Sequence, residues 1–260
     1  MHCYCDLIAL AATPKGLSMI RPIPALPVIA LASCLLATPA LAAPGLGDEV
    51  YGATVEPGEW EIETRYGILA GGPDAGEGNF RLEVGYGVSG HTRLAAVAEF
   101  EKEPGQPRKL EAISFEAIQN IARIGPIDVA LYGEFEAVRG GTDQAEAKLL
   151  LEYRDRLTDV RFNLKMAKPL VSGAPVELAY AASADISVAD NLRLGVTGFG
   201  DLGTFGRFAP YAEHFFGPTV KFRINGIGAP LRVETGYMFA IAAAKADTKG
   251  MFRLNLELEL

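Results

Sequence analysis

The sequence ends in Phe252-Arg253-Leu254-Asn255-Leu256-Glu257-Leu258-Glu259-Leu260, a strict alternation of apolar and polar side chains. Successive side chains of a β-strand point to opposite faces, so this stretch predicts a strand with one apolar face and one polar face. Its even-numbered residues, from Phe252 to Leu260, would share the apolar face.

The same alternation recurs along most of the chain. It is clearest over residues 60–68, 80–86, 127–136, 145–154, 160–166 and 231–237. Weaker candidates are 92–101, 110–120, 175–184, 191–199 and 211–224. Residues 145–154 could also form a helix, but their charges fall at even positions and only Leu150 breaks that pattern. We therefore expect about 12 strands.

The predicted connections alternate between long and short, as in an up-and-down meander. Soluble barrels and sandwiches alternate as well, with the apolar face turned inward. Here the candidate strands reach roughly 9–11 residues, the length that a tilted strand needs to cross a bilayer. The spacing also leaves no room for a Greek-key crossover. The sequence thus predicts an all-β fold, a transmembrane up-and-down antiparallel β-barrel over residues 58–260.

The last strand resembles the C-terminal strand of Gram-negative outer-membrane β-barrels, which usually ends in Phe or Trp rather than in Leu260. Residues 49–61 are similar to the N-terminus of uncharacterised proteobacterial barrels, and this similarity implies no activity. The resemblance implies an outer-membrane location, contact with outer-membrane lipid and recognition by the barrel-assembly machinery. The implied assembly signal consists of Phe252, Leu254, Leu256, Leu258 and Leu260.

Residues 1–42 have the pattern of a secretory signal peptide, with Arg21 before an apolar run and a predicted cut between Ala42 and Ala43. We predict Met19 as the true start, because Met19-Ile20-Arg21 already supplies the short basic stretch that precedes the apolar run. Two alternatives are a membrane helix, which four prolines disfavour, and a lipoprotein signal at Cys34. All three cysteines precede residue 43, so neither a disulfide nor a thiolate metal site is expected beyond it. Residues 43–57 would form an N-terminal periplasmic segment.

The charge pattern predicts a polar lumen. The formal net charge of −8 gives no basic footprint for nucleic acid, and no cofactor or metal is expected. The candidate lumen-lining residues are Arg81, Glu83, Arg93, Glu134, Arg161, Lys165, Arg193, Arg232, Glu234 and Arg253. They could line an open pore or close the lumen through salt bridges, and the sequence leaves both readings open.

No motif in the sequence predicts an enzyme. Residues 85–90 match GxGxxG, but a nucleotide site needs a helix after the motif, whereas residues 92–100 alternate like a strand. His91 and His214 lack a recognisable catalytic partner. The favoured function is a small passive channel or transporter-type protein for small solutes. The alternatives are a closed structural or adhesion barrel that binds a partner through its outer loops, and a lipid-modifying enzyme.

Overall fold

A computed structural model describes residues 43–226 and 228–260, so the predicted signal peptide, with Met19, Cys34 and Ala42, lies outside the described residues. The described chain forms strands and one short 3-10 helix, η2 (Ala243–Ala246). The first strands are β1 (Trp60–Ala70), β2 (Gly78–Ser89), β3 (Thr92–Lys102), β4 (Lys109–Ile124), β5 (Ile127–Val138), β6 (Gln144–Arg154) and β7 (Thr158–Pro169). The others are β8 (Glu177–Ala189), β9 (Leu192–Thr204), β10 (Arg207–Phe208), β11 (Glu213–Ile224), β12 (Leu231–Ala242) and β13 (Gly250–Glu259).

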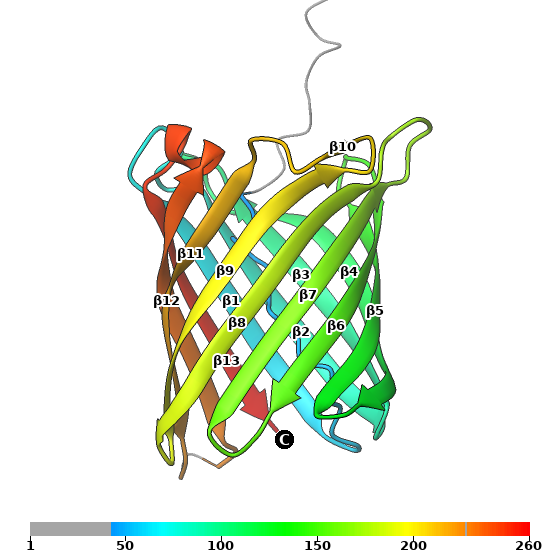
Figure 1. Ribbon diagram of the computed structural model, residues 1–260. Helices are drawn as coiled ribbons and strands as arrows, with labels where there is room; N and C mark the ends of the chain where they lie inside the picture. The colour runs from blue at the N-terminus through cyan, green and yellow to red at the C-terminus, as the bar shows by residue number, and fades with distance from the viewer. Residues whose placement is uncertain (1–42, 227) are drawn as a thin grey trace, which may run out of the picture. The chain divides into compact units, whose positions relative to one another are not determined.

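Twelve of these strands close into an antiparallel barrel in chain order (Figure 1). The barrel closes where β1 pairs with β13, from Glu61 opposite Glu259 to Ala70 opposite Gly250. The two-residue strand β10 only extends β9 at one end. The predicted fold class and strand number are therefore confirmed, and residues 144–154 form a strand rather than a helix.

The connections differ in length between the two ends of the barrel (Figure 1). Short turns and the C-terminus lie at one end, here called the lower end, and the longer loops, with β10 and η2, lie at the upper end. This is the long and short alternation that the sequence predicts. None of the helical segments in the described part of the chain is long and apolar enough to cross a membrane.

The barrel turns its apolar side chains outward and its charged side chains inward. On β4, for example, Phe115 is 65% exposed, whereas its neighbour Glu116 is 3% exposed. On β1 and β2, the inward-facing Arg65 and Glu83 are 1% and 0% exposed. This distribution is the reverse of a soluble barrel and fits an outer face solvated by lipid.

The C-terminal strand follows the same pattern. Phe252 and Leu260 are exposed, and the even-numbered residues of β13 pair with outward-facing partners, such as Leu258 with Ile62. Backbone hydrogen bonds between Leu260 and Trp60 continue the closure of the barrel past the end of β13. The residues of the predicted assembly signal therefore lie on the outer wall beside the seam, while their recognition by assembly factors stays a prediction.

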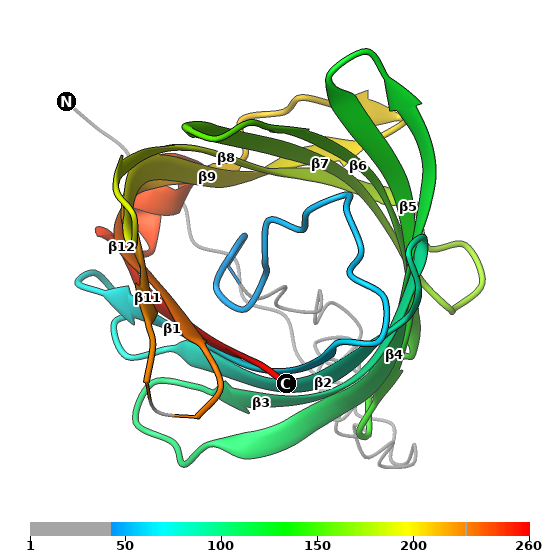
Figure 2. The same cartoon turned by 90° about the horizontal axis from the view of Figure 1, so that it is seen from below.

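Residues 43–57 lie inside the barrel rather than outside it (Figure 2). The sequence predicts a periplasmic extension at residues 43–57. Instead, Leu46 packs in a cluster with Phe215 and Met238 near the upper end, and Tyr51 packs with Tyr132 near the middle. We call residues 43–57 the lumenal segment.

Two wall glycines allow the lumenal segment to approach the backbone of the barrel. A Cβ atom added at Gly67 of β1 would lie 1.9 Å from the carbonyl oxygen of Leu46. A Cβ atom added at Gly87 of β2 would lie 1.9 Å from the carbonyl oxygen of Glu56. Any other residue at these positions would push the segment away from the wall.

Candidate functional site

The structure places all ten predicted lumen-lining residues on the inner face of the barrel. Arg81, Glu83, Arg93 and Glu134 are buried there, and the other six are partly exposed to the interior. Alternation along the strands explains this placement, since each of these residues is flanked by outward-facing neighbours. The structure also brings most of them into ion pairs.

One charge network joins β1, β2 and β3. The guanidinium of Arg65 forms an ion pair with Glu83 and lies 3.7 Å from Glu49 and 3.8 Å from Glu63. Arg93 bridges Glu83, at 2.5 Å, and Glu61. The network neutralises carboxylates that would otherwise be buried without a counter-charge.

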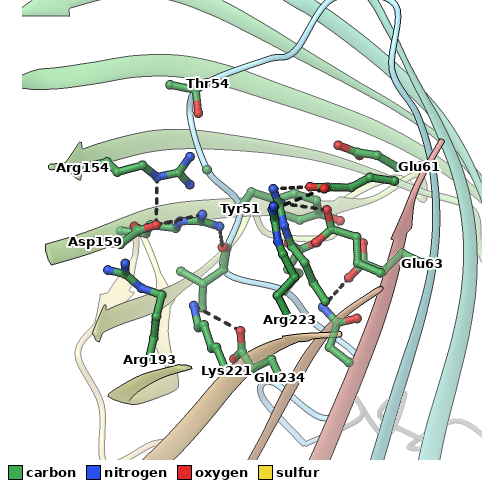
Figure 3. A pocket seen from close by; sticks show the side chains of 18 of the residues that line it. Tyr51, Thr54, Glu61, Glu63, Arg154, Asp159, Arg193, Lys221, Arg223 and Glu234 are labelled. Carbon is green, nitrogen blue, oxygen red and sulfur yellow. Dashed lines mark hydrogen bonds and ion pairs between the residues drawn. The ribbon is translucent and has the colours of Figure 1, made fainter. Parts of the chain in front are cut away.

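A second set of ion pairs lies on β6, β7, β8, β11 and β12 (Figure 3). Glu152 pairs with Arg154 at 2.6 Å, and Asp159 accepts from both Arg154 and Arg161. Further around the wall, the Lys221 amine lies 3.0 Å from Asp185 and 3.2 Å from Glu234. The remaining pairs include Arg193 with Asp185 and Arg232 with Glu257.

The lumenal segment is held to the wall by side chains that bond to its backbone. Asn163 of β7 accepts from the Tyr51 amide at 2.7 Å and donates to the Tyr51 carbonyl oxygen at 3.0 Å. Glu152 accepts from the backbone N–H groups of Ala53 and Thr54 at 2.8 and 3.0 Å. Every buried backbone polar group needs a hydrogen-bond partner. These side chains supply the partners that a neighbouring strand would supply in a sheet.

Further contacts tie the segment to opposite parts of the wall. Asn120 of β4 donates to the Ala53 carbonyl oxygen at 2.8 Å. The Tyr51 hydroxyl donates to Glu116 at 3.1 Å and accepts from Arg65 at 2.9 Å. Nearer the upper end, the Lys165 amine lies 3.4 Å from Asp48. The segment is therefore fixed along its length rather than at one point.

The interior keeps two cavities beside the segment. The lower cavity, of about 410 Å³, is lined by residues 49–52 and 54–56 of the segment and by inward-facing residues near the short turns, including Asp190 and Glu259. The upper cavity, of about 320 Å³, is lined by Asp48 and Glu49, and by residues such as Asp201. Glu49 borders both, so the segment lies where the two spaces meet.

Three carboxylates come close enough together to hold a metal ion. Oxygen atoms of Glu49, Glu63 and Glu83 lie within 4.8 Å of one another. Arg65 contacts all three, so a guanidinium already supplies the positive charge that a cation would bring. The arrangement is explained by ion pairing alone.

The residues considered for catalysis do not form a catalytic group. Residues 85–90 cover the end of β2 and its antiparallel turn into β3, and a strand rather than a helix follows them. His214 of β11 lies beside Tyr180 of β8, with 3.3 Å between its Nδ1 atom and the tyrosine hydroxyl. Both side chains belong to the outward-facing set, since Ala181 and Phe215, their chain neighbours, are buried inside.

The residues that anchor the lumenal segment could not be predicted from the sequence. Asn120 and Asn163 were not candidates, because an Asn among other polar inward residues does not stand out in the sequence. Glu152 and Arg65 lie in stretches whose alternation predicts strands, but nothing in their spacing pointed to the segment. Their partners lie far away in the sequence. Alternation predicts only which face of the sheet a side chain occupies, and not which residue it contacts.

Comparisons with known proteins agree with this geometry. No protein-family model matches the chain, and no curated protein matches it. Among solved structures, the KdgM porin in complex with disordered oligogalacturonate has a TM-score of 0.53 at 9% identity, covering 76% of this chain and 97% of that one. The NanC porin has a TM-score of 0.52 at 9% identity, with 76% and 98% coverage. An outer membrane channel from Pseudomonas putida F1 has a TM-score of 0.52 at 10% identity, with 84% and 99% coverage. The chain therefore has the fold of Gram-negative outer-membrane β-barrel channels.

Proposed function

We propose that this protein is an outer-membrane β-barrel that conducts small solutes passively, with the lumenal segment setting the width of its path. The observation that carries the proposal is the inverted distribution of side chains. Apolar residues such as Phe115 cover the outside, while charged residues such as Arg65 and Glu83 face an interior that holds two cavities. A closed barrel with this pattern is stable in lipid and offers a polar route through it.

The similar structures support the channel reading at the level of the fold. They are porins and channels, and one of them holds oligogalacturonate. The barrel would span the membrane with its short turns in the periplasm and its longer loops outside, as in the up-and-down arrangement. A catalytic role has no support from the described inward-facing side chains, most of whose basic groups are taken up in ion pairs with carboxylates.

A second candidate is a closed structural or adhesion barrel that binds a partner through its upper loops. The lumenal segment favours it, because the segment lies where the two cavities meet and is bonded to β4, β6 and β7. In this reading the segment is a permanent part of the interior.

Reconstitution in planar bilayers separates the two candidates. The passive channel predicts conductance steps for the chain beginning at Ala43, after purification from outer-membrane fractions. Heat-modifiable migration on a gel shows in parallel that the barrel is folded. Folded protein without conductance, both intact and after deletion of residues 44–56, would refute the channel and leave the closed barrel.

A further inference from the structure

The interior of the barrel carries more carboxylates than basic groups at both ends. Eleven carboxylates and seven basic side chains line the lower cavity, a surplus of four negative charges. Four carboxylates and two lysines line the upper cavity, a surplus of two. Glu49 is common to both counts, so the surplus belongs to one continuous acidic interior.

The basic side chains of both cavities are already paired. Each of the seven in the lower cavity lies within 4.0 Å of a carboxylate; Arg223, for example, pairs with Glu259 at 3.3 Å. In the upper cavity, Lys148 and Lys165 lie 2.9 and 2.8 Å from Glu146. A paired cation offers little attraction to a solute anion, because its field is largely cancelled at short range.

Five of the carboxylates that line the two cavities have no ion pair within the described chain. Glu56, Glu59 and Asp190 border the lower cavity, and Glu177 and Asp201 border the upper one. The Asn255 side-chain oxygen, a buried acceptor on the lower cavity, also lacks a hydrogen-bond partner. Arg253 is a positive charge that opposes these carboxylates. Its guanidinium lies over the Phe199 ring and donates to the Asp48 backbone oxygen.

We propose that the lumen selects small cations over anions. This inference rests on the proposed channel function and names its class of solute. Carboxylates that line a narrow low-dielectric passage attract cations into it and exclude anions. A lumen potential of only about one kT would enrich monovalent cations over anions roughly sevenfold.

The test is the zero-current potential of the reconstituted channel in a KCl gradient. Cation selectivity shifts this potential toward the K⁺ equilibrium potential. In liposome swelling assays, glucosamine should enter faster than galacturonate, a sugar of similar size and opposite charge. A shift toward the Cl⁻ equilibrium potential, or no shift, would overturn the inference while leaving the channel intact. Absence of conductance would instead count against the channel function itself.

A pair of double variants assigns the effect to the lumen. Glu177→Gln with Asp201→Asn removes two unpaired carboxylates from the upper cavity and should lower the K⁺ to Cl⁻ permeability ratio. Asp74→Asn with Glu103→Gln removes two charges from the upper loops without touching a cavity and should leave the ratio unchanged. Equal ratios in both variants and the unmodified protein would refute the role of the upper carboxylates.

Discussion

Replacement of Asn163 by Leu should loosen the lumenal segment and widen the conducting path. Asn163 is 1% exposed and makes two hydrogen bonds with the Tyr51 backbone, at 2.7 and 3.0 Å. Leu has the same number and branching of side-chain heavy atoms as Asn, so the wall of the barrel should keep its fold. The variant therefore tests the attachment of the segment rather than the fold.

The size of the effect follows from the two lost bonds. At about 1 kcal/mol each, they stabilise the bound segment by about 2 kcal/mol, which changes an equilibrium constant roughly thirtyfold. A displaced state populated at about 1% would rise to about a quarter of the molecules. This is a lower bound, since the Tyr51 amide and carbonyl would stay unpaired whenever the segment is bound.

Single-channel recording measures this population directly. Asn163→Leu should show openings to a larger conductance, and deletion of residues 44–56 should show that level permanently. Asn255→Leu is the matched control, because Asn255 donates to the wall residue Glu63, at 2.5 Å, and not to the segment. Heat-modifiable migration verifies that each variant is folded.

Two results would refute the reasoning. The first is a folded Asn163→Leu variant and a folded deletion variant that both conduct like the unmodified protein, since the segment would then not limit the path. The second is a larger conductance in Asn255→Leu as well, which would attribute the change to the loss of any inner Asn.

Three further predictions test other parts of the structure. Gly67→Val should displace the lumenal segment and raise conductance, because a Cβ atom there would lie 1.9 Å from the Leu46 carbonyl oxygen. Gly133→Val is the control and should leave conductance unchanged, because nothing lies within 4 Å of the added atom. Equal single-channel conductance in the two variants would contradict this prediction. Phe115→Lys places a charge on the outer face and should lower the free energy of unfolding by roughly 2–4 kcal/mol at a site near the bilayer midplane. Phe205→Lys, in an upper loop, should have little effect. Urea titrations in lipid vesicles compare the two variants. Cation selectivity should decrease as the pH falls from about 7 to about 4, because carboxylates lose their charge below their pKa. Partial burial and the neighbouring Glu259, Glu61 and Glu56 raise the pKa of Glu59, opposed by Arg232, so Glu59 should lose its charge at a higher pH than an ordinary glutamate, and Glu59→Gln should make the decrease in zero-current potential smaller.

The barrel itself could be predicted from alternation because a two-faced wall imposes a period of two on every strand. Residues 145–154 show how well this works: their charges at even positions predicted a strand, and β6 follows that pattern from Gln144 to Arg154. The turn lengths also followed from the sequence, since Gly- and Pro-rich stretches separate the alternating runs. The short strand β10 could not be predicted, because two residues carry no period.

The pairing of inner charges could be predicted only in part. Arg93 and Glu83 were both expected to face the lumen, and they form an ion pair at 2.5 Å. Their pairing depends on the register between β2 and β3, which places Gly85 opposite Ala95. Because Gly85 has no side chain, the Arg93 guanidinium can extend along the strands to Glu83. Alternation fixes the face of a residue but not its register, so partners on neighbouring strands stayed undetermined.

The lumenal segment escaped prediction for a deeper physical reason. In a soluble protein a buried segment shows apolar residues, because the interior excludes water. Inside this barrel most of the wall is polar, so a short segment with only a few apolar residues can be buried with its backbone bonded to Asn163, Glu152 and Asn120. The signal lies in the wall instead: Gly67 and Gly87 interrupt charged inner faces at the points where the segment's backbone comes closest. Gly67 and Gly87 are therefore the features of the wall that accompany the internal segment, whereas Gly85 on the same face of β2 makes room for the Arg93 side chain instead.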